Sequence, residues 1–204
     1  MMRVTLKPEP DDFDAKVRRP GLRALDQFKT GKRKTLPTVW TKCIDDLWRA
    51  YDGTCAYLCV HIFKATGARS VEHFSAKSSD RTLMYEWRNF RLVCATINGW
   101  KSAYDDVLDP IKIQDGWFEL EFRTGETIVV PGNRLGKKRR TAVEQTIKRL
   151  RLNDPKCIYD RQVYYDEYQA GETTYGHLQR YCPFVAREVH RLGLRRARDS
   201  TVAT

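Results

Sequence analysis

Two short strand-like runs, the second followed at once by a helical pattern, constrain this chain more than any other feature. Residues 70–74 and 90–94 have the length and composition of strands, and residues 97–104 have the pattern of a helix. Because side chains alternate between the two faces of a strand, Glu72 and His73 place two unlike groups at one strand end. The sequence therefore predicts two strands and a helix that carry an acid beside a histidine.

The polar residues of this segment divide the roles that phosphodiester hydrolysis requires. His73 is the natural general base because its ordinary pKa lies near neutral pH, and Glu72 suits a hard cation. Asn98 adds an amide oxygen, and a site with oxygen ligands alone favours Mg²⁺ or Mn²⁺ over Zn²⁺. Asn89 is expected to fix the neighbouring loop and to orient His73. The candidates for phosphate contacts are Lys77, Arg91 and Lys101.

The charge of the chain favours a polyanionic partner. Its formal net charge is +11 and its pI is about 9.5. The run Lys137, Lys138, Arg139 and Arg140 is either a solvated helix entrance or a track for a nucleic-acid backbone. We find neither an apolar stretch of membrane-spanning length nor the apolar segment of a signal peptide, so we expect a cytoplasmic protein with no membrane partner.

The site residues resemble those of the HNH endonucleases, a family with a ββα-metal fold. Glu72 and His73 match the acid–histidine pair of the first strand, and Asn89 matches the central asparagine. Asn98 matches the last metal ligand, and Lys101 stands in the usual place three residues later. The resemblance implies hydrolysis of DNA with a single divalent ion.

A narrower resemblance covers more of the chain. It is carried by residues 55–57, 70–74 with 77–78, 85–89, 108–110 and 183–188. These segments are similar to the HNH subunit of Septu-type and retron-linked anti-phage defence systems. In that family the nuclease works beside an ABC- or SMC-like ATPase, so the resemblance implies such a partner, although composition and spacing do not show one.

The cysteines depart from the pattern of these relatives, which usually close a structural zinc site with two C-x-x-C knuckles. Cys55 and Cys59 are separated by three residues, and Ile97 stands where a partner of Cys94 is expected, so a four-cysteine site cannot be assembled. His61 is a possible substitute as fourth ligand. We expect instead that the thiols pack as small apolar groups and that structural Zn²⁺ is absent.

We predict an α+β, mostly helical protein in three parts. An extended basic N-terminal arm spans residues 1–37, and an HNH ββα-metal core with a leading helix at 38–51 spans residues 38–110. Residues 111–204 form a C-terminal hairpin at 117–130 and helices. A capping box at 141–144 is expected to begin one helix, and two more are expected at 156–169 and 174–193.

Two other functions remain open from the sequence. One is a catalytically degraded HNH module that binds nucleic acid or docks an ATPase. The other is an RNase that acts on tRNA or another structured RNA with the same chemistry. Retention of Glu72, His73, Asn89 and Asn98 together favours a working nuclease.

Overall fold

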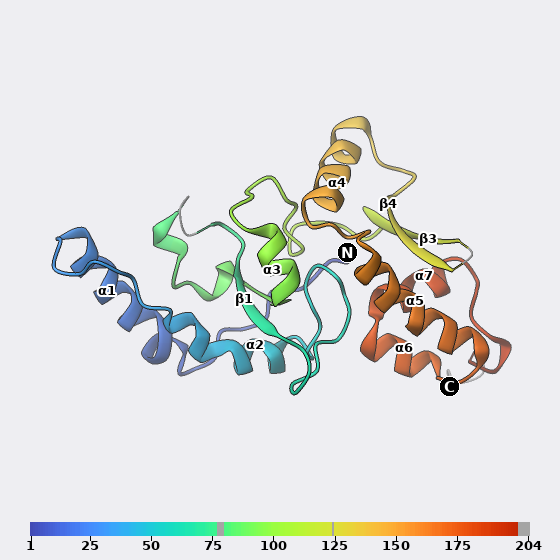
Figure 1. Cartoon of the computed structure of the whole chain (residues 1–204), viewed down its shortest axis with the longest axis horizontal. Helices are drawn as coiled ribbons and strands as arrows, with labels where there is room; N and C mark the ends of the chain where they lie inside the picture. The colour runs from blue at the N-terminus through green and yellow to red at the C-terminus, as the bar shows by residue number, and fades with distance from the viewer. Residues whose placement is uncertain (77–79, 124, 200–204) are drawn as a thin grey trace. The chain divides into compact units, whose positions relative to one another are not determined.

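We describe residues 1–76, 80–123 and 125–199 from a computed structural model (Figure 1). Within these residues the chain is α+β and 46% helical, with seven α-helices and two small antiparallel sheets, which confirms the predicted class. It divides into a site unit, Thr5–Gly53 with Ile62–Asp105, and a C-terminal unit, Met1–Val4 with Thr54–His61 and Asp106–Thr204. No helix in the described ranges has the length and apolar character needed to cross a membrane.

The centre of the site unit is a hairpin followed directly by a helix. Strands β1 (Arg69–His73) and β2 (Phe90–Cys94) pair antiparallel, and α3 (Ala95–Lys101) follows. The second strand has the predicted bounds, whereas the helix begins two residues before the predicted 97 and ends at Lys101. It ends there because Ser102 has a positive φ of 46°, which a continuing α-helix does not allow.

A helical segment replaces much of the predicted extended arm. The π-helix η1 (Asp14–Arg18) leads into α1 (Arg19–Lys29), with a proline in the first turn, where its missing N–H is tolerated. Gly21 lies against the Tyr85 ring, and a Cβ at this position would lie 2.2 Å from the Tyr85 Cγ. The Pro–Gly pair that suggests a break is therefore a helix start and a close packing contact.

The predicted helix at 38–51 is present in two pieces. A 3₁₀ turn, η2 (Val39–Cys43), precedes α2 (Ile44–Ala50), and both contribute buried apolar side chains. Two further 3₁₀ turns, η3 (Arg81–Leu83) and η4 (Trp87–Asn89), lie between the strands of the hairpin. The structure thus groups most of the predicted arm with the ββα segment, and it groups residues 54–61 with the C-terminal unit.

The C-terminal unit contains the predicted hairpin and four helices. Strands β3 (Phe118–Arg123) and β4 (Glu126–Pro131) pair antiparallel, which confirms the hairpin. They are followed by α4 (Lys137–Arg149), α5 (Pro155–Ala170), α6 (Tyr175–Tyr181), α7 (Pro183–Arg191) and the 3₁₀ turn η5 (Ala197–Asp199). Figure 1 shows α5, α6 and α7 grouped next to the β3–β4 hairpin.

Two predicted helix bounds in this unit are wrong. The capping box at 141–144 does not begin a helix, because α4 already starts at Lys137 and the Thr141 hydroxyl donates to the Lys137 carbonyl. The predicted helix at 174–193 is divided at Cys182 into α6 and α7. Pro183 has no N–H for the α6 ladder and drives the preceding residue out of the helical region, so a new helix must begin.

Candidate active site

Three of the predicted site residues line one cavity within the site unit. Glu72 and His73 come from the end of β1, and Asn98 comes from α3. The cavity has a volume of about 400 Å³, and Val71, Ala76, Ser102 and Ala103 complete its wall. The hairpin-and-helix order of the chain brings the acid, the histidine and the amide together.

The His73 ring is buried and held in one orientation. Its Nε2 lies 2.9 Å from the Met84 carbonyl oxygen, which can only accept a hydrogen bond, so Nε2 carries the proton. The rings of Trp40 and Phe90 stand edge-on to the imidazole, with centroids at 4.8 and 5.0 Å. In the neutral ring Nδ1 is therefore the nitrogen that can accept a proton.

Asn89 forms hydrogen bonds to the backbone beside the carbonyl that orients His73. Its Oδ1 accepts from the Ser75 N–H at 2.8 Å, and its Nδ2 donates to the carbonyls of Ser75 and Leu83, both at 3.1 Å. Met84, which supplies the acceptor for His73, directly follows Leu83. The link from Asn89 to the histidine thus runs through the loop backbone.

Lys101 is fully buried and pairs with Glu72. Its Nζ lies 2.8 Å from Glu72 Oε1, and it also donates to the carbonyls of Phe74 at 3.2 Å and His73 at 3.4 Å. The prediction that Lys101 contacts phosphate is wrong in this structure, because its ammonium faces the protein interior. A spacing in the sequence does not reveal which face of α3 the fold covers.

Arg91 is also buried and does not present a phosphate-binding group to solvent. Strand pairing sets it opposite Glu72, and its Nη1 donates to the carbonyls of Arg88 and Phe90, both at 2.8 Å. Its guanidinium lies over the Phe74 ring at 5.4 Å. The predicted phosphate contact is therefore wrong for Arg91 as well, and the prediction for Lys77 falls outside the described residues.

Asn98 and Glu72 are the oxygen donors that a cation would meet in this cavity. The Asn98 Nδ2 donates to the Ser70 hydroxyl at 2.6 Å, so the amide oxygen is the atom left to face a ligand. A carboxylate has about four lone-pair positions, and the contact with the Lys101 ammonium occupies one of those of Glu72. The donor set fits a hard cation that keeps most of its ligands as water.

The proposed zinc ligands are not brought together as a cluster. Cys55, Cys59 and His61 belong to the C-terminal unit, whereas Cys94 belongs to the site unit. Across the described ranges no three His, Cys, Asp or Glu side chains are grouped so that they could hold a metal ion. Burial raises the pKa of the Cys59 thiol, which opposes the thiolate that zinc binds.

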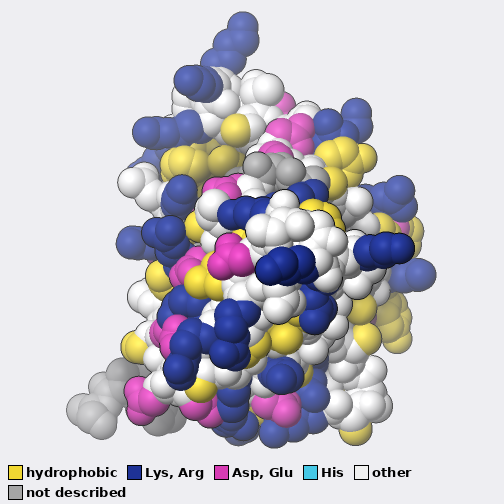
Figure 2. Space-filling view, turned by 90° about the vertical axis from the view of Figure 1, so that its left-hand side faces the viewer, with side chains coloured by type: hydrophobic (Ala, Val, Ile, Leu, Met, Phe, Trp, Pro, Cys, Tyr) yellow, Lys and Arg dark blue, Asp and Glu magenta, His cyan; other side chains and the backbone are white. Residues whose placement is uncertain are grey.

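The basic run at 137–140 forms the first turn of α4 and is largely exposed. Lys137, Lys138 and Arg139 are exposed, whereas Arg140 is half-buried and donates to the Gly132 carbonyl at 3.1 Å. Figure 2 shows Lys and Arg side chains spread over the face seen from the α1 side of Figure 1, with acidic side chains between them. The surface charge therefore extends well beyond the run that the sequence singles out.

Several groups that shape the site escape prediction from the sequence. The acceptor for His73 is the backbone carbonyl of Met84, which no side chain in the sequence indicates. Ser70 is a strand residue whose hydrogen bond with Asn98 appears only in the folded structure. Trp40 lies in the predicted helix at 38–51, but its contact with His73 depends on long-range packing. Only the spacing of Glu72 and His73 from Asn98 is visible in the sequence.

Comparison with known proteins adds no family to this description. No protein-family model and no curated protein matches the chain. Function is therefore inferred from the side chains and their geometry.

Proposed function

We propose that this chain is a metal-dependent HNH-type endonuclease that hydrolyses phosphodiester bonds of DNA. The observation that carries the proposal is the cavity shared by Glu72, His73 and Asn98, in which the His73 tautomer is set by the Met84 carbonyl. A fixed base beside two oxygen donors is the arrangement that hydrolysis with a divalent ion requires. The resemblance of these residues to the HNH signature supports the same reaction.

In this mechanism His73 is the general base. Its Nδ1 takes a proton from a water molecule while the water oxygen attacks phosphorus and the bond to the leaving oxygen breaks. The ring becomes an imidazolium, and its Nε2–H remains on the Met84 carbonyl, whose dipole favours the new charge. A divalent ion held by Glu72 and Asn98 would stabilise the negative charge on the phosphoryl and leaving oxygens.

The basic surface supports a nucleic-acid substrate. The net charge is +11, and the exposed side chains of Lys137, Lys138 and Arg139 are available for phosphate contacts. DNA is the proposed substrate, and structured RNA such as tRNA is the alternative with the same chemistry. The proposal also includes an ABC- or SMC-like ATPase partner and a role in anti-phage defence. These two parts rest only on the resemblance to the defence-system nucleases.

The test is cleavage of plasmid DNA by the full chain in Mg²⁺ or Mn²⁺, alone and with any ATPase that copurifies with it. His73→Ala is expected to reduce the rate by about 100-fold or more, because it removes the general base. His190→Ala, which removes an exposed histidine of α7, is the matched control and is expected to cut as the parent does. Equal rates for His73→Ala and the parent would contradict the proposal, and so would a parent that cuts neither DNA nor tRNA.

The Glu72–Lys101 pair favours a second candidate, a non-catalytic HNH-like module that binds DNA or docks an ATPase. The buried ammonium at 2.8 Å already compensates the carboxylate that a cation needs. This candidate predicts DNA binding without cleavage and no saturable binding of Mn²⁺. Calorimetric titration of the parent and of Glu72→Gln with Mn²⁺ distinguishes the two, because only the nuclease loses a Mn²⁺ site on substitution.

A further inference from the structure

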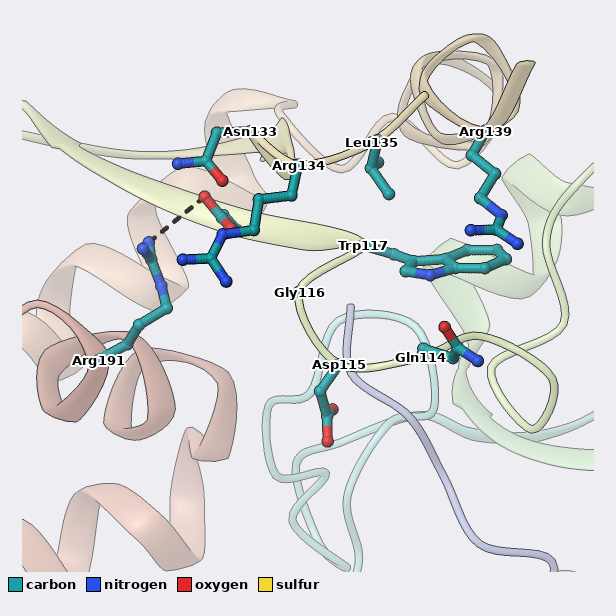
Figure 3. A pocket seen from close by; sticks show the side chains of 10 residues that line it. Gln114, Asp115, Gly116, Trp117, Asn133, Arg134, Leu135, Arg139 and Arg191 are labelled. Atoms are coloured by element: carbon teal, nitrogen blue, oxygen red, sulfur yellow. Dashed lines mark ion pairs between the residues drawn. The ribbon is translucent and has the colours of Figure 1, made fainter. Parts of the chain in front are cut away.

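A second cavity, of about 580 Å³, lies within the C-terminal unit (Figure 3). We call it the arginine pocket. Its principal side chains come from separate elements of the unit: Gln114, Trp117, Asn133, Arg134, Arg139 and Arg191. Of these only Arg139 belongs to the basic run that the sequence indicates, and the proposed nuclease reaction uses none of the pocket's other residues.

Two loops that contribute residues to the arginine pocket pack closely against each other. The Gly132 N–H donates to the Trp117 carbonyl at 3.0 Å, which ties the loop after β4 to the start of β3. A Cβ at Gly132 would lie 1.8 Å from the Gly116 carbonyl oxygen, so only glycine allows this approach. Gly116 itself has a φ of +81°. The backbone beside the pocket therefore depends on glycine at these two positions.

The two acidic residues of the pocket wall already have cationic partners. Asp115 pairs with Arg187 at 3.3 Å, and Glu119 pairs with Arg191 at 3.6 Å, the ion pair drawn in Figure 3. Arg191 also lies 2.7 Å from the buried carboxylate of Glu188. These carboxylates are therefore not counter-ions for the remaining arginines of the pocket.

Arg134 and Arg139 are two guanidinium groups without a counter-ion. Within the described part of the chain neither forms an ion pair or a hydrogen bond, although both line the cavity. Arg139 lies flat over the Trp117 indole at 5.4 Å, as Figure 3 shows. Stacking fixes the plane of the guanidinium while its in-plane N–H groups stay available for an oxyanion. Two such groups suit the double charge of a phosphate monoester.

The rest of the arginine pocket suits a nucleoside. A cavity of about 580 Å³ is in the size range of small-molecule sites and exceeds what a phosphate group alone fills. The side-chain amides of Gln114 and Asn133 line it beside the indole of Trp117, and amides can donate to and accept from a base edge. We propose that the arginine pocket binds a nucleoside monophosphate, either as a free nucleotide or as the 5′-phosphorylated end of a strand.

Calorimetric titration of the full chain tests this proposal. The probes are AMP, adenosine, inorganic phosphate, and a short single-stranded oligonucleotide with or without a 5′-phosphate. The variants are Arg134→Gln and Arg139→Gln, with Lys148→Gln as the matched control, since Lys148 is an exposed cation of α4 that does not line the pocket. All three positions are exposed, and unchanged thermal unfolding shows that each variant folds.

We expect a saturable site for AMP or for the 5′-phosphorylated oligonucleotide. Each arginine variant is expected to weaken that binding by about tenfold or more, because a charge-assisted hydrogen bond is lost, whereas Lys148→Gln changes it less than about twofold. Binding of AMP identifies a free nucleotide, and binding of the phosphorylated strand alone identifies a strand end.

Other outcomes overturn the proposal. If inorganic phosphate binds as tightly as AMP, the pocket does not recognise the nucleoside. If a strand without 5′-phosphate binds as tightly as the phosphorylated strand, the protein contacts the strand's backbone and not its end. Equal losses for Lys148→Gln and Arg134→Gln would indicate diffuse charge, and the absence of any saturable site would also contradict the proposal. Because His73→Ala leaves the pocket intact, this result is separate from the fate of the proposed nuclease.

Discussion

At the scale of single residues, the buried Glu72–Lys101 pair defines the chemistry of the candidate site. Both side chains are almost completely buried, and Lys101 also bridges the carbonyls of His73 and Phe74 at the end of β1. Removing one partner of such a pair leaves an uncompensated charge in the interior, which costs more than the pair itself contributes. The lysine therefore stabilises the strand end that carries the proposed base.

Lys101→Met tests this role. The free energy of unfolding is expected to fall by about 3–5 kcal/mol, because the buried carboxylate of Glu72 loses the Lys101 ammonium. The double variant Glu72→Gln with Lys101→Met is expected to lose less than Lys101→Met alone. Urea denaturation measures the free energy of unfolding of Glu72→Gln, Lys101→Met and the double variant, with the exposed Lys148→Met as control. A double variant that loses the sum of the two single losses would show that the charges do not interact.

At the scale of elements, Asn89 joins residues that follow β1 to residues that precede β2. Asn89, next to β2, makes three hydrogen bonds to the backbone of residues that follow β1. The same segment supplies Tyr85, whose ring occupies the space beside Gly21 of α1. Loop, hairpin and α1 are thus joined by side chains that lie far apart in the sequence.

Asn89→Ala is expected to loosen this segment. Loss of the amide removes three part-buried hydrogen bonds to the backbone of Ser75 and Leu83, and the free energy of unfolding should fall by about 1–3 kcal/mol. Hydrogen exchange at the Ser75 N–H should become faster than in the parent. The exposed Asn133→Ala is the control. Unchanged exchange at Ser75 would mean that the loop is ordered without Asn89.

At the scale of the whole molecule, buried thiols link stability to alkaline pH. Burial raises the pKa of Cys43 in the site unit and of Cys157 and Cys182 in the C-terminal unit, each from 9.0 to about 12. A group whose pKa is raised on folding stabilises the fold fully below its unfolded pKa. That contribution is lost as the pH rises from about 9 to 12, because the unfolded chain then releases the proton more readily.

The free energy of unfolding is therefore expected to fall between pH 9 and 12. Cys182→Ala should unfold more easily at pH 8, because it leaves a cavity, but its stability should fall less steeply over that window. Val189→Ala, a core truncation without an ionisable group, is the control and should keep the slope of the parent. If the free energy of unfolding falls equally steeply with pH in Cys182→Ala and in the parent, the Cys182 thiol does not contribute to the alkaline loss of stability.

Much of the local structure follows from the sequence. The strand at 90–94 and the hairpin in 117–130 are confirmed, and α5 lies within a residue of its predicted bounds. Local periodicity and turn residues determine such elements because the backbone hydrogen bonds involved join near neighbours. The spacing of Glu72 and His73 from Asn98 likewise anticipates a shared cavity, since a hairpin and the helix after it must lie together.

Only the tertiary structure decides which of these side chains meet solvent and which meet each other. Lys101 and Arg91 are cations that the sequence suggests for phosphate contacts, yet both are buried. Arg134 and Arg139 are two exposed cations among many in the sequence, and only the fold places them around one pocket with Gln114 and Trp117. The physical reason is that exposure and charge compensation depend on partners distant in the chain, which a local pattern does not encode.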